Sequence, residues 1–229
     1  MGRGPYGTNR FRTPATEGEG RAVLVRDIMK SPVVVADADA TLASTYSLMQ
    51  ERRIRHVPVV RKGSLVGIVT DRDLRLATST LSAKPFPPRA RLEKVMSQPV
   101  QTADPLDPVE EAARTMRQLK IGCLPVTAGK EVVGIVTGLD LLDALLRLTG
   151  VSMATGRLEI GLPDHPGELA RLTAFLAAKQ VNIRSILSYA DTGDKVRLVL
   201  RVGTIEVKIV AQELRAQGFE VLWPAQGPW

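Results

Sequence analysis

The sequence predicts an α+β protein made of two consecutive β-α-β-β-α repeats followed by a smaller βαββαβ unit. Two observations lead to this fold class. The phrase VGIVTDRDL at residues 66–74 returns as VGIVTGLDL at residues 133–141, which places a second copy of the first unit 67 residues downstream. After residue 156 the repeat ends, and a different order of strand and helix patterns begins.

The two copies align over far more than nine residues and need no gap. From Asp27 to Leu74, 16 of 48 residues are identical to their counterparts 67 positions later. Each copy is expected to begin with a short strand and an amphipathic helix, because apolar residues recur at i, i+3, i+4 and i+7 from Leu42 and again from Val109. Two strands around a turn and a second helix complete the copy. Because units of about 60 residues bury little surface alone, we expect the copies to pack around a shared core.

The C-terminal unit has strand and helix patterns in the order βαββαβ. Helices are expected after Pro166 and from Val207, where leucine and valine recur on one face. Strands are expected at 157–163, 181–190, 195–202 and 219–223. This order is that of a ferredoxin-like plait.

These patterns divide the chain into six segments. The expected segments are a polar leader at 1–22, the first repeat at 23–79, a proline-rich linker at 80–91, the second repeat at 92–149, a short linker at 150–156 and the C-terminal unit at 157–229.

Composition and charge argue against several classes of protein. The chain has no apolar run of the 18 or more residues that a membrane helix needs, and its first 22 residues lack the apolar stretch of a signal peptide. Cys123 is the only cysteine, so we expect no disulfide and a cytoplasmic location. The net charge of +7 divides into +2 over 1–22, +4 over 23–156 and +1 over 157–229. Nucleic acid is not the expected partner, because proteins that bind it concentrate Lys and Arg along one stripe.

No catalytic motif stands out. The sequence has no G-x-S-x-G nucleophile elbow and no Walker A phrase. Two histidines with one cysteine cannot build a closed zinc site without carboxylates at ligand spacing, and none appears. We therefore expect no enzyme activity, no catalytic cofactor and no metal ligands.

The repeated Thr-x-x-Asp phrase has two interpretations. Thr70 with Asp73, and Thr137 with Asp140, fit a capping box that satisfies free N–H groups at a helix start. Both phrases also follow Gly-apolar-apolar and open a helix, and a helix N-terminus favours an anionic ligand. A structural cap and a ligand site both remain open on these residues alone.

The duplicated G-h-h-T-x-x-D phrase (h, apolar), in register with IRHVPVV and IGCLPVT, resembles the signature of tandem cystathionine-β-synthase (CBS) domains over residues 23–149. The resemblance implies two clefts that bind adenosine-containing ligands such as AMP, ADP, ATP or S-adenosylmethionine. It leaves open whether Mg²⁺ accompanies the phosphates. The residues it implies are Thr70, Asp73, Thr137 and Asp140 for ribose and phosphate, and, beside adenine, Val34, Gln101 and Thr102 in strands at 33–35 and 100–102.

The two copies differ at positions that face phosphate in this family. The first copy has Arg55 and Arg72, where the second has Gly122 and Leu139. Either the clefts bind different ligands, or one cleft is occupied and the other is vestigial. Alternatively, the arginines belong to a solvated face.

The phrases LPDHPGELARL (162–172) and VNI (181–183) resemble an ACT domain, a family that binds amino acids and similar effectors across a dimer interface. In its ligand-binding members the loop after the first strand and the start of the second strand form the site. This implies Asp164, Gly167 and Asn182 as effector-binding residues. Alternatively, Asp164 caps the helix, Gly167 serves the turn, and the domain only dimerises.

Tandem CBS domains followed by an ACT domain resemble the bacterial acetoin utilisation protein B family, which implies a regulator near acetoin or carbon metabolism. The expected function is a homodimeric sensor that binds an adenine nucleotide and acts on an unidentified protein target. A structural dimerisation module with degenerate ligand sites is the second interpretation, and a nucleic-acid-binding regulator is the third.

Overall fold

The computed structural model describes residues 24–226, so the leader expected at 1–22 lies outside the described residues. The chain divides into two compact units, one ending at Ala144 and one beginning at Leu145. The division falls within helix α5 (Gly138–Leu148). Among residues 24–226, no helix has the length and apolar composition that crossing a bilayer requires.

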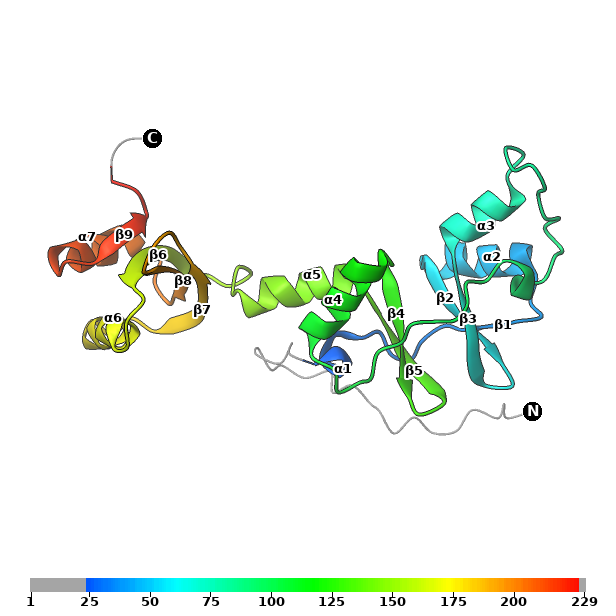
Figure 1. Ribbon diagram of the computed structural model, residues 1–229, viewed down its shortest axis with the longest axis horizontal. Coiled ribbons are helices and arrows are strands. Elements are labelled where there is room, and N and C mark those ends of the chain that lie inside the picture. Colours follow the sequence, from blue (N-terminus) through cyan, green and yellow to red (C-terminus); the bar gives the residue numbers. More distant parts are fainter. Residues whose placement is uncertain (1–23, 227–229) are drawn as a thin grey trace. The chain divides into compact units, whose positions relative to one another are not determined.

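The first unit contains both repeats (Figure 1). The first copy forms α1 (Val25–Ile28), β1 (Ala36–Asp37), α2 (Leu42–Arg52), β2 (His56–Arg61), β3 (Ser64–Thr70) and α3 (Asp71–Thr78). The second copy forms the 3₁₀ turn η1 (Leu92–Lys94), α4 (Val109–Leu119), β4 (Cys123–Ala128), β5 (Glu131–Thr137) and α5. The predicted β-α-β-β-α order is therefore confirmed in the first copy, which α1 precedes, and the second copy keeps this order from α4 onward.

The opening strands predicted at 33–35 and 100–102 are wrong, because neither segment is a strand. β1 has two residues, which pair in parallel with β2. In the second copy an isolated bridge between Ala103 and Val126 takes its place. Residues 33–35 and 100–102 instead belong to loops that cross from one copy to the other.

The segment that opens each copy packs on the other copy. α1 contributes to the hydrophobic core of the second copy, beside α4 and β5, and η1 contributes to that of the first (Figure 1). Backbone bridges repeat this exchange, because Lys30 pairs with Ile135 and Ser97 pairs with Ile68. The unit thus has two separate cores with exchanged opening segments, in place of the single shared core that the sequence predicted.

Two repeated glycines make room for the exchanged segments. A Cβ at Gly67 would lie 2.4 Å from Met96 Sδ, and a Cβ at Gly134 would lie 2.6 Å from Met29 Sδ. Each methionine precedes the crossing loop of the opposite copy. The glycine in the repeated Gly-apolar-apolar phrase is therefore required by the close approach of the other copy.

The second unit is a four-stranded antiparallel sheet with two helices, as predicted. It contains β6 (Gly156–Pro163), α6 (Glu168–Ala178), β7 (Ile183–Ala190), β8 (Lys195–Val202), α7 (Val207–Ala216) and β9 (Glu220–Trp223), and the sheet order is β7-β8-β6-β9. Alternate residues of β6 and β8 form one core with both helices, because successive strand residues point to opposite faces. The order is that of the ferredoxin-like plait.

Candidate functional site

A cleft of about 880 Å³ opens between the two copies in the first unit. The first copy supplies residues 53–56 and the N-terminal end of α3 at 70–72. The second copy supplies Gly122, the end of β5 and the N-terminal end of α5. Lys30 and residues 32–34 of the crossing loop complete the lining. The N-termini of two helices therefore meet at one cleft, because the exchange of opening segments brings the copies together there.

The repeated Thr-x-x-Asp phrases form helix caps in both copies. Asp73 Oδ2 accepts hydrogen bonds from the Thr70 N–H at 2.9 Å and from the Thr70 hydroxyl at 2.8 Å. Asp140 Oδ2 accepts the same two bonds from Thr137, at 2.8 and 2.6 Å. In both cases the second carboxylate oxygen, Oδ1, takes no part in the cap. The cap and a ligand role are therefore compatible.

The surroundings of the two Oδ1 atoms differ. Lys30 Nζ lies 3.5 Å from Asp140 Oδ1, and the Asp140 side chain is 8% exposed. No hydrogen bond or ion pair from residues 24–226 reaches Asp73 Oδ1. The Asp140 carboxylate thus faces a cation, whereas the Asp73 carboxylate keeps an open acceptor.

The cations that line the cleft all come from the first copy. They are Lys30, Arg53, Arg55 and Arg72. Three carboxylates also line the cleft: Asp71 from the first copy, and Asp140 and Asp143 from the second. Asp71 is paired with Arg75 at 3.0 Å. None of the three lining arginines forms an ion pair within the part of the chain that the structure describes. An unpaired guanidinium on a concave surface favours an anionic ligand such as phosphate.

His56 lies between the copies. Burial, together with the neighbouring Arg55 guanidinium, lowers the pKa of His56 below its ordinary value, so the ring is neutral at pH 7. A Cβ at Gly122 would lie 3.1 Å from His56 Nε2. Gly122, the counterpart of Arg55 in the second copy, therefore also leaves space for the His56 ring.

Of the residues implied for the nucleotide, six line this cleft: Val34, Arg55, Thr70, Arg72, Thr137 and Asp140. Asp73 is hydrogen-bonded to Thr70 at its edge. Lys30 and Arg53 also line the cleft and were not singled out from the sequence. The exchanged segment places Lys30 there, and no residue pattern within one copy predicts that exchange.

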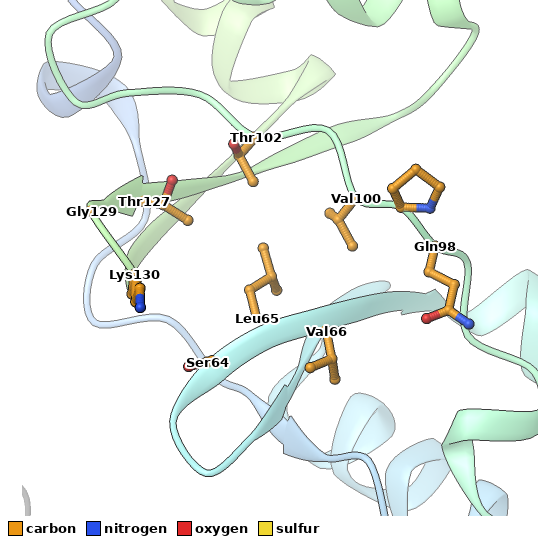
Figure 2. A pocket seen from close by; sticks show the side chains of 10 residues that line it. Ser64, Leu65, Val66, Gln98, Val100, Thr102, Thr127, Gly129 and Lys130 are labelled. Carbon is orange, nitrogen blue, oxygen red and sulfur yellow. The ribbon is translucent and has the colours of Figure 1, made fainter.

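Gln101 and Thr102 do not line this cleft. Thr102 lines a second cleft of about 790 Å³, between β3 of the first copy and the β4–β5 turn. Leu65 and Val100 project into the space between β3 and the crossing loop (Figure 2). Lys130 is the one charged residue in that lining.

The residues implied for an ACT effector lie at opposite ends of the second unit. The Asp164 N–H donates to the Asp194 carbonyl, next to the end of β6 where Pro163 pairs with Lys195. The Asn182 carbonyl accepts from the Gly203 N–H at the far end of β8. Seven strand steps, roughly 24 Å, separate these ends. One chain therefore does not bring Asp164 and Asn182 together.

The alternative role of Asp164 as a helix cap is wrong. The residue that caps α6 is Gly167, with φ 99°, and no side chain accepts a hydrogen bond at this cap. A glycine suits this left-handed conformation because it has no Cβ. The turn role of Gly167 is therefore confirmed.

Metal and thiol chemistry find little support in the described residues. Residues 24–226 contain no group of three His, Cys, Asp or Glu side chains placed to hold a metal ion. Burial, with the Asp73 carboxylate as a second cause, raises the pKa of Cys123 to about 12. The thiol is therefore protonated and a poor nucleophile at neutral pH.

Family models and curated relatives identify the domains. The CBS domain model matches residues 25–79 and 92–147, and the TTHA0829-like ACT domain model matches residues 155–223. A CBS domain-containing protein of Dictyostelium discoideum is 39% identical over 55% of this chain and 93% of its own length. The CBS domain-containing protein YhcV of Bacillus subtilis is 32% identical over 51% and 81%. An enzyme, the L-aspartate semialdehyde sulfurtransferase of Methanocaldococcus jannaschii, is 31% identical over 52% of this chain but only 22% of its own length.

Solved structures with a related fold include two CBS proteins. A Vibrio cholerae protein assigned to acetoin utilization (AcuB) is 34% identical, over 56% of this chain and 94% of its own, with a TM-score of 0.49. The CBS domain pair of protein MJ0100, solved with 5′-methylthioadenosine and S-adenosyl-L-methionine, is 30% identical over 53% and 94%, with a TM-score of 0.48. The chain belongs to the CBS domain-containing proteins, and its CBS pair is followed by an ACT domain of the TTHA0829-like class.

Proposed function

We propose that this chain is a regulatory sensor that binds an adenine nucleotide in the cleft between its CBS domains. CBS pairs and ACT domains are regulatory ligand-binding modules. The observation that carries the proposal is the charge division of the cleft. The first copy supplies three unpaired arginines, and the second supplies the capped Asp140 carboxylate, the Asp143 carboxylate and the Thr137 hydroxyl.

Each part of a nucleotide has a matching surface in the cleft. Asp140 Oδ1, which the cap does not use, can accept a hydrogen bond from a ribose hydroxyl, and hydrogen bonds to charged groups are the stronger ones. Val33, Val34 and Ile135 offer apolar surface for a planar base. Arg55 and Arg72 face the same space from the other wall, where they can bind phosphate.

Exchange of residues between the copies tests the phosphate assignment. The double variant Arg55→Gly with Arg72→Leu carries the residues of the second copy at both positions. We expect its dissociation constant for AMP to rise about tenfold or more, because a lost hydrogen bond to a charged group is worth about 1.5–3 kcal/mol. The dissociation constant for adenosine should change little.

Titration calorimetry with AMP and adenosine distinguishes the alternatives. Equal losses for the two ligands would mean that the arginines shape the cleft without holding phosphate. A wild-type chain that binds neither ligand at micromolar concentration would overturn the sensor proposal and favour a structural dimerisation module. Binding to DNA that weakens steeply with salt would favour the nucleic-acid interpretation.

A homodimer is part of the same proposal. Asp164 and Asn182 lie at opposite ends of one sheet, so an effector site that uses both needs a second copy. β7 is an edge strand, and its Ile186, Leu187 and Tyr189 are exposed. An exposed edge strand of this kind favours pairing with another chain. Light scattering that gives the 24.8 kDa monomer mass across the micromolar range would overturn the dimer and the shared effector site.

The protein target and the location complete the proposal. The resemblance to the acetoin utilisation protein B family supports a partner in acetoin or carbon metabolism. A cytoplasmic location fits Cys123, whose buried thiol is free. We propose that the chain itself is not an enzyme and transmits ligand binding to its partner; turnover of AMP or ATP by the purified chain would contradict this.

A further inference from the structure

Lys30 is held against the second CBS domain although it belongs to the sequence of the first. Its N–H donates to the Ile135 carbonyl at 2.8 Å, and its carbonyl accepts from the Ile135 N–H at 3.1 Å. The preceding Met29 packs over Gly134. These contacts hold the backbone of Lys30 beside Ile135, which precedes Thr137 by two residues, at the rim of the cleft.

The Lys30 ammonium lies beside the carboxylate oxygen that we propose as the acceptor of a ribose hydroxyl. Its Nζ lies 3.5 Å from Asp140 Oδ1, the oxygen left free by the helix cap. The Lys30 side chain is 74% exposed, whereas Asp140 is almost buried. The lysine therefore compensates a carboxylate that has little contact with water.

The second copy offers an internal comparison. Ser97 stands at the position equivalent to Lys30, and it pairs with Ile68 as Lys30 pairs with Ile135. Within residues 24–226, no cation forms an ion pair with Asp73, the counterpart of Asp140. In the described part of the chain, an ammonium group therefore lies beside Asp140 but not beside Asp73, so the fold does not require it.

We propose that Lys30 is a specificity-determining residue that makes the cleft select phosphorylated adenosine ligands over uncharged or cationic ones. This inference rests on the proposed function of the cleft. An incoming ribose displaces the ammonium from Asp140 Oδ1, and the flexible four-carbon stem of lysine lets it swing within the cleft. A ligand that carries phosphate gives the ammonium a new partner. Adenosine gives it none, and the sulfonium of S-adenosylmethionine repels it.

The variant Lys30→Ser tests this inference, because it places the residue of the second copy in the first. We expect the ratio of AMP affinity to adenosine affinity to fall about fivefold to tenfold, through weaker AMP binding and unchanged or tighter adenosine binding. Lys30→Met should do the same while keeping the apolar stem. Lys84→Ser is the matched control, because it removes one exposed lysine from the linker and changes the net charge equally.

Calorimetry with AMP and adenosine on the full chain separates the outcomes. A fall of the ratio in both Lys30 variants, but not in Lys84→Ser, supports the inference. An unchanged ratio in the Lys30 variants overturns it and leaves the sensor proposal intact. A wild-type chain that binds neither AMP nor adenosine overturns the sensor proposal, and the inference with it.

Discussion

Replacing Asp140 by asparagine separates the two roles of this carboxylate. In the wild type, Oδ2 accepts two hydrogen bonds from Thr137, and Oδ1 faces the cleft and Lys30. Asparagine keeps one acceptor oxygen for the cap and replaces the other oxygen by an amide NH₂, which cannot accept from a ribose hydroxyl. Asp140→Ala removes both functions, so the pair of variants distinguishes a lost cap from a lost ligand contact.

The expected magnitudes follow from the contacts. The Asn variant should lose about 1 kcal/mol of folding stability, because two charge-assisted hydrogen bonds become neutral ones. The Ala variant should lose about 0.5–2 kcal/mol for the cap alone. Both variants should raise the dissociation constants of AMP and adenosine about tenfold or more, because both ligands carry the ribose.

Urea unfolding and titration calorimetry on the same preparations provide the two readouts. Asp73→Asn is the matched control, since its cap has the same geometry. If the Asp73 variant alone loses affinity, the nucleotide lies at the other carboxylate. Unchanged affinity in a less stable Asp140→Asn chain would refute the ligand role and leave only the cap.

Three further changes test packing and protonation, each by urea unfolding. Gly134→Ala should destabilise the chain by about 1–3 kcal/mol, since its Cβ would meet Met29 Sδ and the Lys30 carbonyl. Gly138→Ala is the control and should not destabilise the chain, because Gly138 lies in open space at the start of a helix. Equal losses of stability in the two variants would contradict the packing argument. Thr45→Val should stabilise by about 1 kcal/mol, because the Thr45 hydroxyl is buried with no partner among the described residues; a loss of stability would mean that this hydroxyl is bonded. His56 has a lowered pKa, so charging it favours the unfolded state: stability should be full above pH 6.5 and fall as the pH drops further, and His56→Gln should flatten this slope.

The elements of this fold could be predicted from the sequence because their patterns are local. The i, i+3, i+4, i+7 spacing from Leu42 marks α2, and the alternation in 195–202 marks β8, in each case within one segment. The capping boxes were equally local.

The exchange of opening segments could not be predicted in this way. Val25, Ile28 and Met29 read as apolar residues of the first copy, and their sequence does not say which core receives them. The choice depends on the shape of the other copy, above all on the space over Gly134. The repeated Gly-apolar-apolar phrase is visible in the sequence, but the methionine that packs over its glycine is not. The prediction of one shared core was wrong for this reason.

The same exchange explains why the candidate site was only partly predicted. Arg55, Thr70 and Asp140 carry motif signals, and the structure brings all three to one cleft. Lys30 carries no signal, because it is an ordinary exposed lysine until its backbone is bonded to Ile135. A site residue supplied across a repeat boundary becomes visible only when the packing of the two copies is known.

The differences in charged residues between the two copies therefore lie mainly in one cleft, and they do not distinguish two separate clefts. Lys30, Arg55 and Arg72 all line the cleft that contains Asp140, and their counterparts are serine, glycine and leucine. Two of those counterparts, Gly122 and Leu139, line the same cleft. A cation at either position would face the first copy's arginines and raise the repulsion between them, because like charges at short range destabilise one another. The change from DRD to GLD in the second copy thus keeps the Asp140 carboxylate and leaves the arginine guanidinium groups on the wall that the first copy supplies. For a ligand with an anionic end and a hydroxylated end, we therefore expect the anionic end to lie at the arginines and the hydroxyls to lie at Asp140.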